Sequence, residues 1–196
     1  AIRDATGFVH LNAANAELLN AALKVCGVSK TERRDLVDAV LDWRDKDDLT
    51  RLHGVEDDDY FAAGVAWSSR DDAFEAVDVL KYLPGMSQAR HDCLAPFVTG
   101  HSGRAGLNME YAPPALITAL TGEEIPAVAP EGADSETGTP RNGTFHIYAS
   151  ASGSAATVAA IEAVIEISRA SDAPFKVLDW REPPRVEFPP RDGGQG

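Results

Sequence analysis

The sequence has little basic charge and no long apolar segment, and each shortage excludes a class of protein. Lysine and arginine number 18 against 31 aspartate and glutamate residues, so the 196-residue chain has a formal charge of −13. Such a surface disfavours nucleic acid and anionic lipid, which are bound by clustered cations. No apolar run approaches the ~20 residues that span a bilayer, and the N-terminus lacks the features of a signal peptide. Because the chain begins inside sequence typical of folded structure, we expect a further segment to precede it.

Cysteine is also scarce, since only Cys26 and Cys93 are present. Neither belongs to a CxxC motif or lies beside a histidine at metal-ligand spacing, so a zinc site is not expected. The two residues form either one disulfide in an oxidising compartment or two buried thiols, and the sequence leaves both open.

Acidic residues are concentrated in one segment, residues 42–60, which reads DWRDKDDLTRLHGVEDDDY. Its eight carboxylates and three cations leave a local formal charge of −5. Carboxylates this close repel one another in a folded loop unless a cation lies among them. Alternating oxygen ligands around a glycine are typical of calcium, which takes about six to eight of them. The candidate structural calcium ligands are Asp45, Asp47, Asp48, Glu56, Asp57 and Asp58.

Other interpretations of this segment stay open. Its spacing is not that of an EF-hand, and a solvated acidic surface loop is the simpler alternative. The same carboxylates could serve a metal-dependent hydrolase, although no pocket signature accompanies them. A Leu83-Pro84-Gly85-Met86 element resembles the hairpin of helix-hairpin-helix DNA-binding modules, but it has one glycine and acidic flanks, which favour a structural turn. We therefore expect neither catalysis nor nucleic-acid binding.

Hydrophobic periodicity predicts helices over much of the first half of the chain. Apolar residues recur at three and four between residues 13 and 41, with a break at 26–29 and Ser29 or Thr31 as the cap of the second helix. Two more helices are predicted at 73–83 and 89–98. Trp43, beside the acidic segment, is expected to anchor the core.

Alternating patterns predict strands at residues 7–12, 144–150 and 175–180, and Trp180 in the last strand is also expected to be a core anchor. Residues 155–169 are ambiguous, and a long antiparallel strand gives the simplest meander. A Leu-Asn pair stands both at 11–12 and at 107–108, bracketing the helical part, which suggests an insertion. We predict an α+β chain with a discontinuous β-domain (1–12 and 105–186), an inserted all-α domain (13–104), an exposed connection (122–143) and a disordered tail (187–196).

Five elements follow one another in an order that resembles the K-type minor pseudopilin of the bacterial type II secretion system. They are GFVHLN (7–12), DWRDKDD with GVEDDDY (42–60), LPGM (83–86), GLNMEYAPPALITAL (106–120) and KVLDWRE (176–182). Two details depart from the family pattern: Arg44 replaces a usually apolar residue, and Glu110 replaces a threonine.

The resemblance implies a pseudopilin antiparallel β-sheet domain with a large inserted α-domain that binds calcium, and an N-terminal transmembrane helix that this chain lacks. It further implies a periplasmic domain of an inner-membrane-anchored protein, with the I-type and J-type minor pseudopilins as partners at the tip of the pseudopilus. A helical domain this wide would not stack repeatedly in a thin filament, which agrees with a place at its end.

Overall fold

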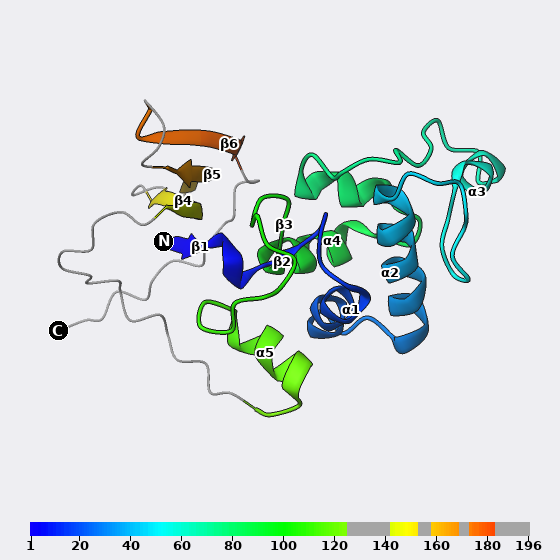
Figure 1. The fold of residues 1–196 in the computed structure, drawn as a ribbon, viewed down its shortest axis with the longest axis horizontal. Helices are drawn as coiled ribbons and strands as arrows, with labels where there is room; N and C mark the ends of the chain where they lie inside the picture. Colours follow the sequence, from blue (N-terminus) through cyan, green and yellow to red (C-terminus); the bar gives the residue numbers. More distant parts are fainter. Residues whose placement is uncertain (125–141, 153–157, 169–172, 183–196) are drawn as a thin grey trace. The chain divides into compact units, whose positions relative to one another are not determined.

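The chain divides into two compact units in a computed structural model that describes residues 1–124, 142–152, 158–168 and 173–182 (Figure 1). A helical unit comprises Thr6–Glu136, and a sheet unit comprises Ala1–Ala5 with Thr137–Gly196. In sequence order the helical unit lies between the two segments of the sheet unit, and it contains the residues predicted as an all-α domain (13–104) together with two short strands. The predicted tail (187–196) and most of the predicted connection (122–143) lie outside the described residues. Among the helices of the described part, none has the length and apolar character needed to cross a membrane.

The helical unit is built from short helices joined by loops. Its α-helices are α1 (Ala16–Val25), α2 (Lys30–Arg44), α3 (Asp57–Ala62), α4 (Gln88–Leu94) and α5 (Pro114–Thr121). The predicted break at residues 26–29 is confirmed. Ser29 caps α2 in a capping box with Glu32, which satisfies free N–H groups at the start of the helix. Helix α3 was not predicted from the sequence.

The predicted helix at 73–83 is wrong in type and length, because the structure has a 3₁₀ helix, η2, only over Val77–Tyr82. Phe74, Val77, Leu80 and Leu83 are all buried and recur every three residues. That spacing matches the three residues per turn of a 3₁₀ helix and not the 3.6 of an α-helix. The predicted helix at 89–98 is shorter than expected, since α4 ends at Leu94 and a 3₁₀ turn, η3 (Ala95–Phe97), follows.

The predicted strand at 7–12 is reduced to β2 (Val9–His10), which pairs in parallel with β3 (Val98–Thr99) inside the helical unit. Asn12 extends this junction, because its amide donates to the Phe74 carbonyl at 3.0 Å and its side-chain oxygen accepts from the Phe74 N–H at 2.7 Å. Arg44 donates to the carbonyls of Leu11 and Ala14. The N-terminal segment is thereby fixed to residues far along the chain.

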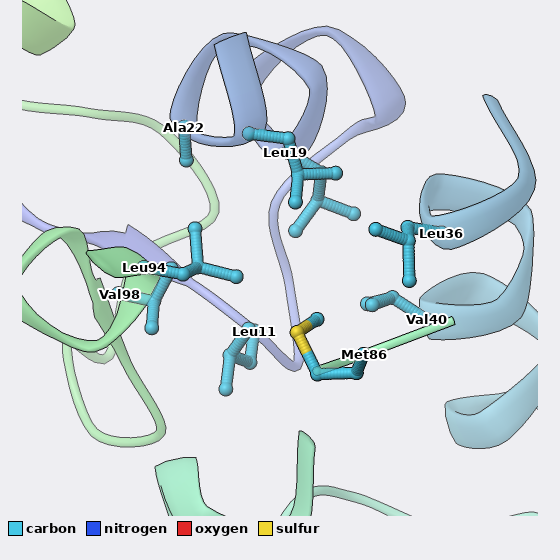
Figure 2. A pocket seen from close by; sticks show the side chains of 9 residues that line it. Leu11, Leu19, Ala22, Leu36, Val40, Met86, Leu94 and Val98 are labelled. Atoms are coloured by element: carbon cyan, nitrogen blue, oxygen red, sulfur yellow. The ribbon is translucent and has the colours of Figure 1, made fainter. Parts of the chain in front are cut away.

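One apolar core fills the helical unit. A small cavity of ≈ 10 Å³ remains at its centre (Figure 2), and its walls are entirely apolar. A cavity with no polar partner does not hold an ordered water. It is therefore a packing gap and not a ligand site. Its lining residues are Leu11, Leu19, Ala22, Leu23, Leu36, Val40, Met86, Leu94 and Val98.

The sheet unit is a four-stranded antiparallel sheet in the order β1-β4-β5-β6. The strands are β1 (Ile2–Asp4), β4 (Gly143–Ser152), β5 (Val158–Ile167) and β6 (Phe175–Arg181). Strands β4, β5 and β6 confirm the predicted meander, including the ambiguous segment, whereas β1 was missed.

The register gives the sheet two contrasting faces, because residues paired across antiparallel strands share a face. Ile147 pairs with Ala163 and Ala163 with Trp180, while Ile165 pairs with Val177. We call this side the apolar face. On the opposite face His146, Glu162 and Arg181 lie close together, with ion-pair distances of 3.6 Å and 3.4 Å from Glu162. The residues of the apolar face, with Asp4 at its edge, are Ile2, Phe145, Ile147, Ala149, Ile161, Ala163, Ile165, Ile167, Phe175, Val177 and Trp180.

Cys26 and Cys93 form a disulfide, which settles the alternative left open by the sequence. Their Cα atoms are 5.8 Å apart, and the bond joins the end of α1 to α4 across 67 residues of sequence. Cross-linking a loop of this length removes much of the conformational entropy of the unfolded chain.

Replacing both cysteines by alanine is expected to lower the free energy of unfolding by about 4 kcal/mol, the loop-entropy value for this separation. Denaturant titration would measure the loss, and reductant should lower the midpoint of the wild-type protein but not that of the double variant. An unchanged wild-type midpoint in reductant would contradict this prediction.

Candidate functional site

The acidic loop, residues 42–60, is organised around one buried carboxylate at the end of α2. Asp42 is fully buried, and its Oδ2 accepts from the N–H groups of Arg51 at 3.2 Å and Val55 at 3.0 Å. Its Oδ1 is ion-paired with the guanidinium of Arg51. A buried charge is costly unless it is paired and hydrogen-bonded, and Asp42 meets both conditions. The chain between residues 51 and 55 is thereby folded around the Asp42 carboxylate.

Gly54 is needed in this loop because its backbone lies against that carboxylate. A Cβ atom at residue 54 would stand 1.7 Å from Asp42 Oδ2, a distance that no side chain can adopt. The N–H of Gly54 also donates to the Arg51 carbonyl at 3.0 Å, closing a turn. Close approach to Asp42 is therefore the reason for glycine at this position.

The guanidinium of Arg51 joins two carboxylates, since its Nη1 contacts both Asp42 and Asp45. The hydrogen bond to Asp45, with a further contribution from Asp42, raises the pKa of Arg51 above its ordinary value, so the side chain is always charged. The second oxygen of Asp45, Oδ1, is buried and accepts no hydrogen bond from the described residues. Arg51 therefore satisfies only part of the negative charge in the loop.

Glu56, the N-cap residue of α3, carries the clearest sign of unbalanced charge. It is 6% exposed, and its Oε1 has no hydrogen-bond donor within the described part of the chain. Burial, followed by the charges of Asp42 and Asp71, raises the pKa of Glu56 from 4.5 to about 7. Asp71 also has a buried oxygen with no donor among the described residues, and its backbone is left-handed, with φ 51°.

The predicted calcium ligands therefore fall into two groups. Asp45 and Glu56 each have a buried oxygen, whereas Asp48 is exposed. The charges of Asp45 and Asp48 both raise the Glu56 pKa. Asp47 accepts from the Leu49 N–H at 3.1 Å, whereas Asp57 and Asp58 lie exposed on the first turn of α3.

Two acidic residues near Glu56, Asp42 and Asp71, were not among the predicted ligands. Asp42 had a sequence signal, because it stands at a helical spacing from buried apolar residues. Asp71 had none, since it reaches the loop from a distant, irregular segment.

The chemistry of these side chains fits calcium, although their arrangement is not that of a ready-made site. In the described ranges, no three His, Cys, Asp or Glu side chains are grouped so as to hold a metal ion. Hard carboxylate oxygens that are buried and lack donors are nevertheless the ligands that calcium takes. Asp45, Glu56 and Asp71 supply such oxygens.

An aromatic group connects the acidic loop to the core of the helical unit. Trp43 follows Asp42 on α2, stacks on Phe74 with ring centroids 5.8 Å apart, and meets the edge of Tyr60 at 6.2 Å. All three rings are at most 4% exposed, so the prediction for Trp43 is confirmed. Burial, with the charge of Glu56 second, raises the pKa of the Tyr60 hydroxyl. The acidic loop is thus directly connected to packed side chains of the core.

Trp180 differs from its prediction as a core anchor, because it is 59% exposed. It belongs to the apolar face of the sheet, where Ile2, Phe175 and Val177 are also exposed, by 69%, 53% and 45%. Large apolar side chains exposed on a sheet are typical of an interaction site. The sheet unit therefore carries a second candidate site, a surface for a partner.

The environment of the Leu83–Met86 element supports its interpretation as a structural turn and not as a DNA-binding hairpin. Leu83 and Met86 are buried in the core, and Gly85, with φ 79°, has its carbonyl bound by Arg90 at 2.6 Å. These residues form the turn between η2 and α4.

Comparisons with known proteins agree with this description. The family model described as "Type II secretion system (T2SS), protein K" matches residues 3–100. A crystal structure of the GspK-GspI-GspJ complex, from the type 2 secretion system of enterotoxigenic Escherichia coli, contains a chain with a similar fold. The TM-score is 0.63 at 17% identity, covering 93% of this chain and 78% of that one. No curated protein sequence matches.

An α+β chain with an inserted helical unit and an exposed apolar sheet face, matched by this family model, is a minor pseudopilin of a secretion pseudopilus. The chain belongs to the type II secretion system protein K family.

The raised Glu56 pKa predicts an unusual pH dependence of stability. The folded protein keeps a proton on Glu56 up to a pH of about 7, whereas the unfolded chain loses it near 4.5, so stability contributed by this group falls as the pH rises between these values. In chelator, raising the pH from 5 to 8 should lower the melting temperature of wild type more than that of Glu56→Gln. Parallel curves for the two proteins would contradict the assignment.

Proposed function

We propose that this chain is the periplasmic part of a tip subunit of the pseudopilus, which assembles with the I-type and J-type minor pseudopilins of the same system to support protein export. The observation that carries the proposal is the apolar face of the sheet, which is exposed along β6 and at Ile2. The protein with a similar fold was crystallised in a complex with GspI and GspJ.

In the proposed arrangement, a membrane-proximal helix and neighbouring subunits cover the apolar face, and the helix anchors the protein in the inner membrane. The charged face of the sheet is a poor alternative, because Glu162 is already paired there with His146 and Arg181. Burying such a face against a partner would cost more than burying an apolar one.

The Cys26–Cys93 disulfide supports the periplasmic location, since disulfides persist in oxidising compartments.

A non-enzymatic role is supported by the surroundings of the acidic carboxylates. Their strongest contacts are to Arg51 and to backbone N–H groups, and the cavity in the helical core is apolar. The unit is thus a scaffold in which the acidic loop contributes to stability.

Assembly can be tested with adjacent residues of β6 that face opposite ways. Val177→Asn lies on the apolar face and should weaken a one-to-one-to-one complex with the I and J domains by more than about tenfold. Lys176→Asn, on the charged face, should leave it intact. Light scattering of the co-purified domains would decide. Separate elution of the three wild-type domains at tens of micromolar, or equal weakening by both variants, would refute the proposed interface.

The acidic loop is proposed to bind structural calcium. Bound calcium would supply two positive charges to carboxylates that otherwise share one guanidinium. Asp45, Glu56 and Asp71 are proposed as inner ligands because each has a buried oxygen without a donor among the described residues, with Asp48 beside them. Asp47, Asp57 and Asp58 are proposed to contribute charge at the rim.

Calcium at a hundredfold excess over its Kd should stabilise the folded protein by roughly 2.7 kcal/mol, because it binds only that form. Asp45→Asn with Glu56→Gln should abolish the rise in melting temperature. Asp57→Asn with Asp58→Asn removes the same formal charge from exposed positions and should retain most of it. Absence of both a thermal shift and a heat of binding in wild type would refute the calcium site.

A further inference from the structure

Arg51 is a cation of the acidic loop that pairs with two of its carboxylates. Its guanidinium pairs with the fully buried Asp42 and with Asp45, while its own backbone N–H donates to Asp42. The side chain and the backbone of one residue therefore fix the same carboxylate. No other cation of the described loop contacts Asp42, since Arg44 donates instead to the carbonyls of Leu11 and Ala14.

The positive charge of Arg51 is insufficient for the loop. Asp45 Oδ1, Glu56 Oε1 and Asp71 Oδ1 are buried and receive no hydrogen bond from the described residues. Glu56 is more than nine-tenths buried, and its Oε1 is therefore the oxygen of this group that is least able to be satisfied by solvent. A divalent ion bound to Asp45 would lie beside a carboxylate that also contacts Arg51, and two cations at such short range repel.

We propose, on the basis of the calcium site proposed above, that the guanidinium of Arg51 acts as a built-in cation that competes with calcium for the carboxylates of Asp42 and Asp45. Without calcium, Arg51 holds the loop in its folded form. When calcium is bound, the guanidinium gives up Asp45 and turns toward solvent, which is accessible because the side chain is already 37% exposed. This competition sets the calcium affinity of the loop and keeps the calcium-free protein folded.

The proposal makes opposite predictions for affinity and for calcium-free stability. Arg51→Gln removes the competitor, so calcium should bind about tenfold tighter by titration calorimetry. The same variant leaves Asp42 and Asp45 unneutralised, so its melting temperature in chelator should fall below that of wild type. A loss of both affinity and stability, as in ordinary damage to the loop, would overturn the proposal.

Lys46→Gln is the matched control, because it removes one positive charge from an exposed position of the same loop. It should change the affinity less than about twofold, since exposed charges are screened by salt. Arg51→Lys keeps a charge and should lie between wild type and Arg51→Gln. If Arg51→Gln folds only when calcium is added while Arg51→Lys folds without it, the proposal is upheld. If Lys46→Gln tightens binding as much as Arg51→Gln, it fails.

The outcome for wild type separates this inference from the calcium site itself. Calcium binding by wild type with unchanged affinity in Arg51→Gln would overturn the role of Arg51 and leave the calcium site standing. Binding by Arg51→Gln with none by wild type would uphold the competition and refute calcium as a ligand of the natural protein. Absence of binding in both would refute both proposals.

Discussion

The burial of Asp42 is the constraint on which the acidic loop depends. A fully buried carboxylate requires hydrogen-bond donors and a cation within contact distance, and Arg51 and Val55 supply them. Gly54 has no side chain because Asp42 occupies the space where its Cβ would lie. With the backbone from Arg51 to Val55 fixed in this way, Glu56 is placed at the start of α3 and becomes buried near other carboxylates.

The loop matters to the whole helical unit because Asp42 is followed directly by Trp43. That indole packs on Phe74 and Tyr60, and the Phe74 backbone is in turn held by the side chain of Asn12. Charge neutralisation in the loop is thus linked through packed side chains to the N-terminal segment. A structural cation would act by stiffening this connection, whereas the apolar face of the sheet would meet the partners. The two proposed roles belong to separate units of the chain.

Sequence reasoning succeeded where local patterns control structure. Ser29 signals the start of α2, and alternation identifies β4 and β6. The segment of β5 was ambiguous by its pattern and was assigned as a strand because that gave the simplest meander. Sequence reasoning failed where residues distant in sequence determine the local structure. The pairing of Val9–His10 with Val98–Thr99 joins segments some ninety residues apart, and no local sequence pattern predicts it. The acidic loop was identified from charge density, but Asp71 approaches it through tertiary folding alone. Trp180 was mistaken for a core residue because composition does not show which face of a sheet is covered.

The most direct test of this account is a crystal structure of the protein grown with calcium. The account predicts an ion with oxygen ligands at about 2.3–2.6 Å, drawn from Asp45, Glu56 and Asp71, and an Arg51 guanidinium that no longer contacts Asp45. Asp42 should keep its hydrogen bonds from the N–H groups of Arg51 and Val55. A structure in saturating calcium with no ion in the loop, and with Arg51 still joining Asp42 to Asp45, would contradict it.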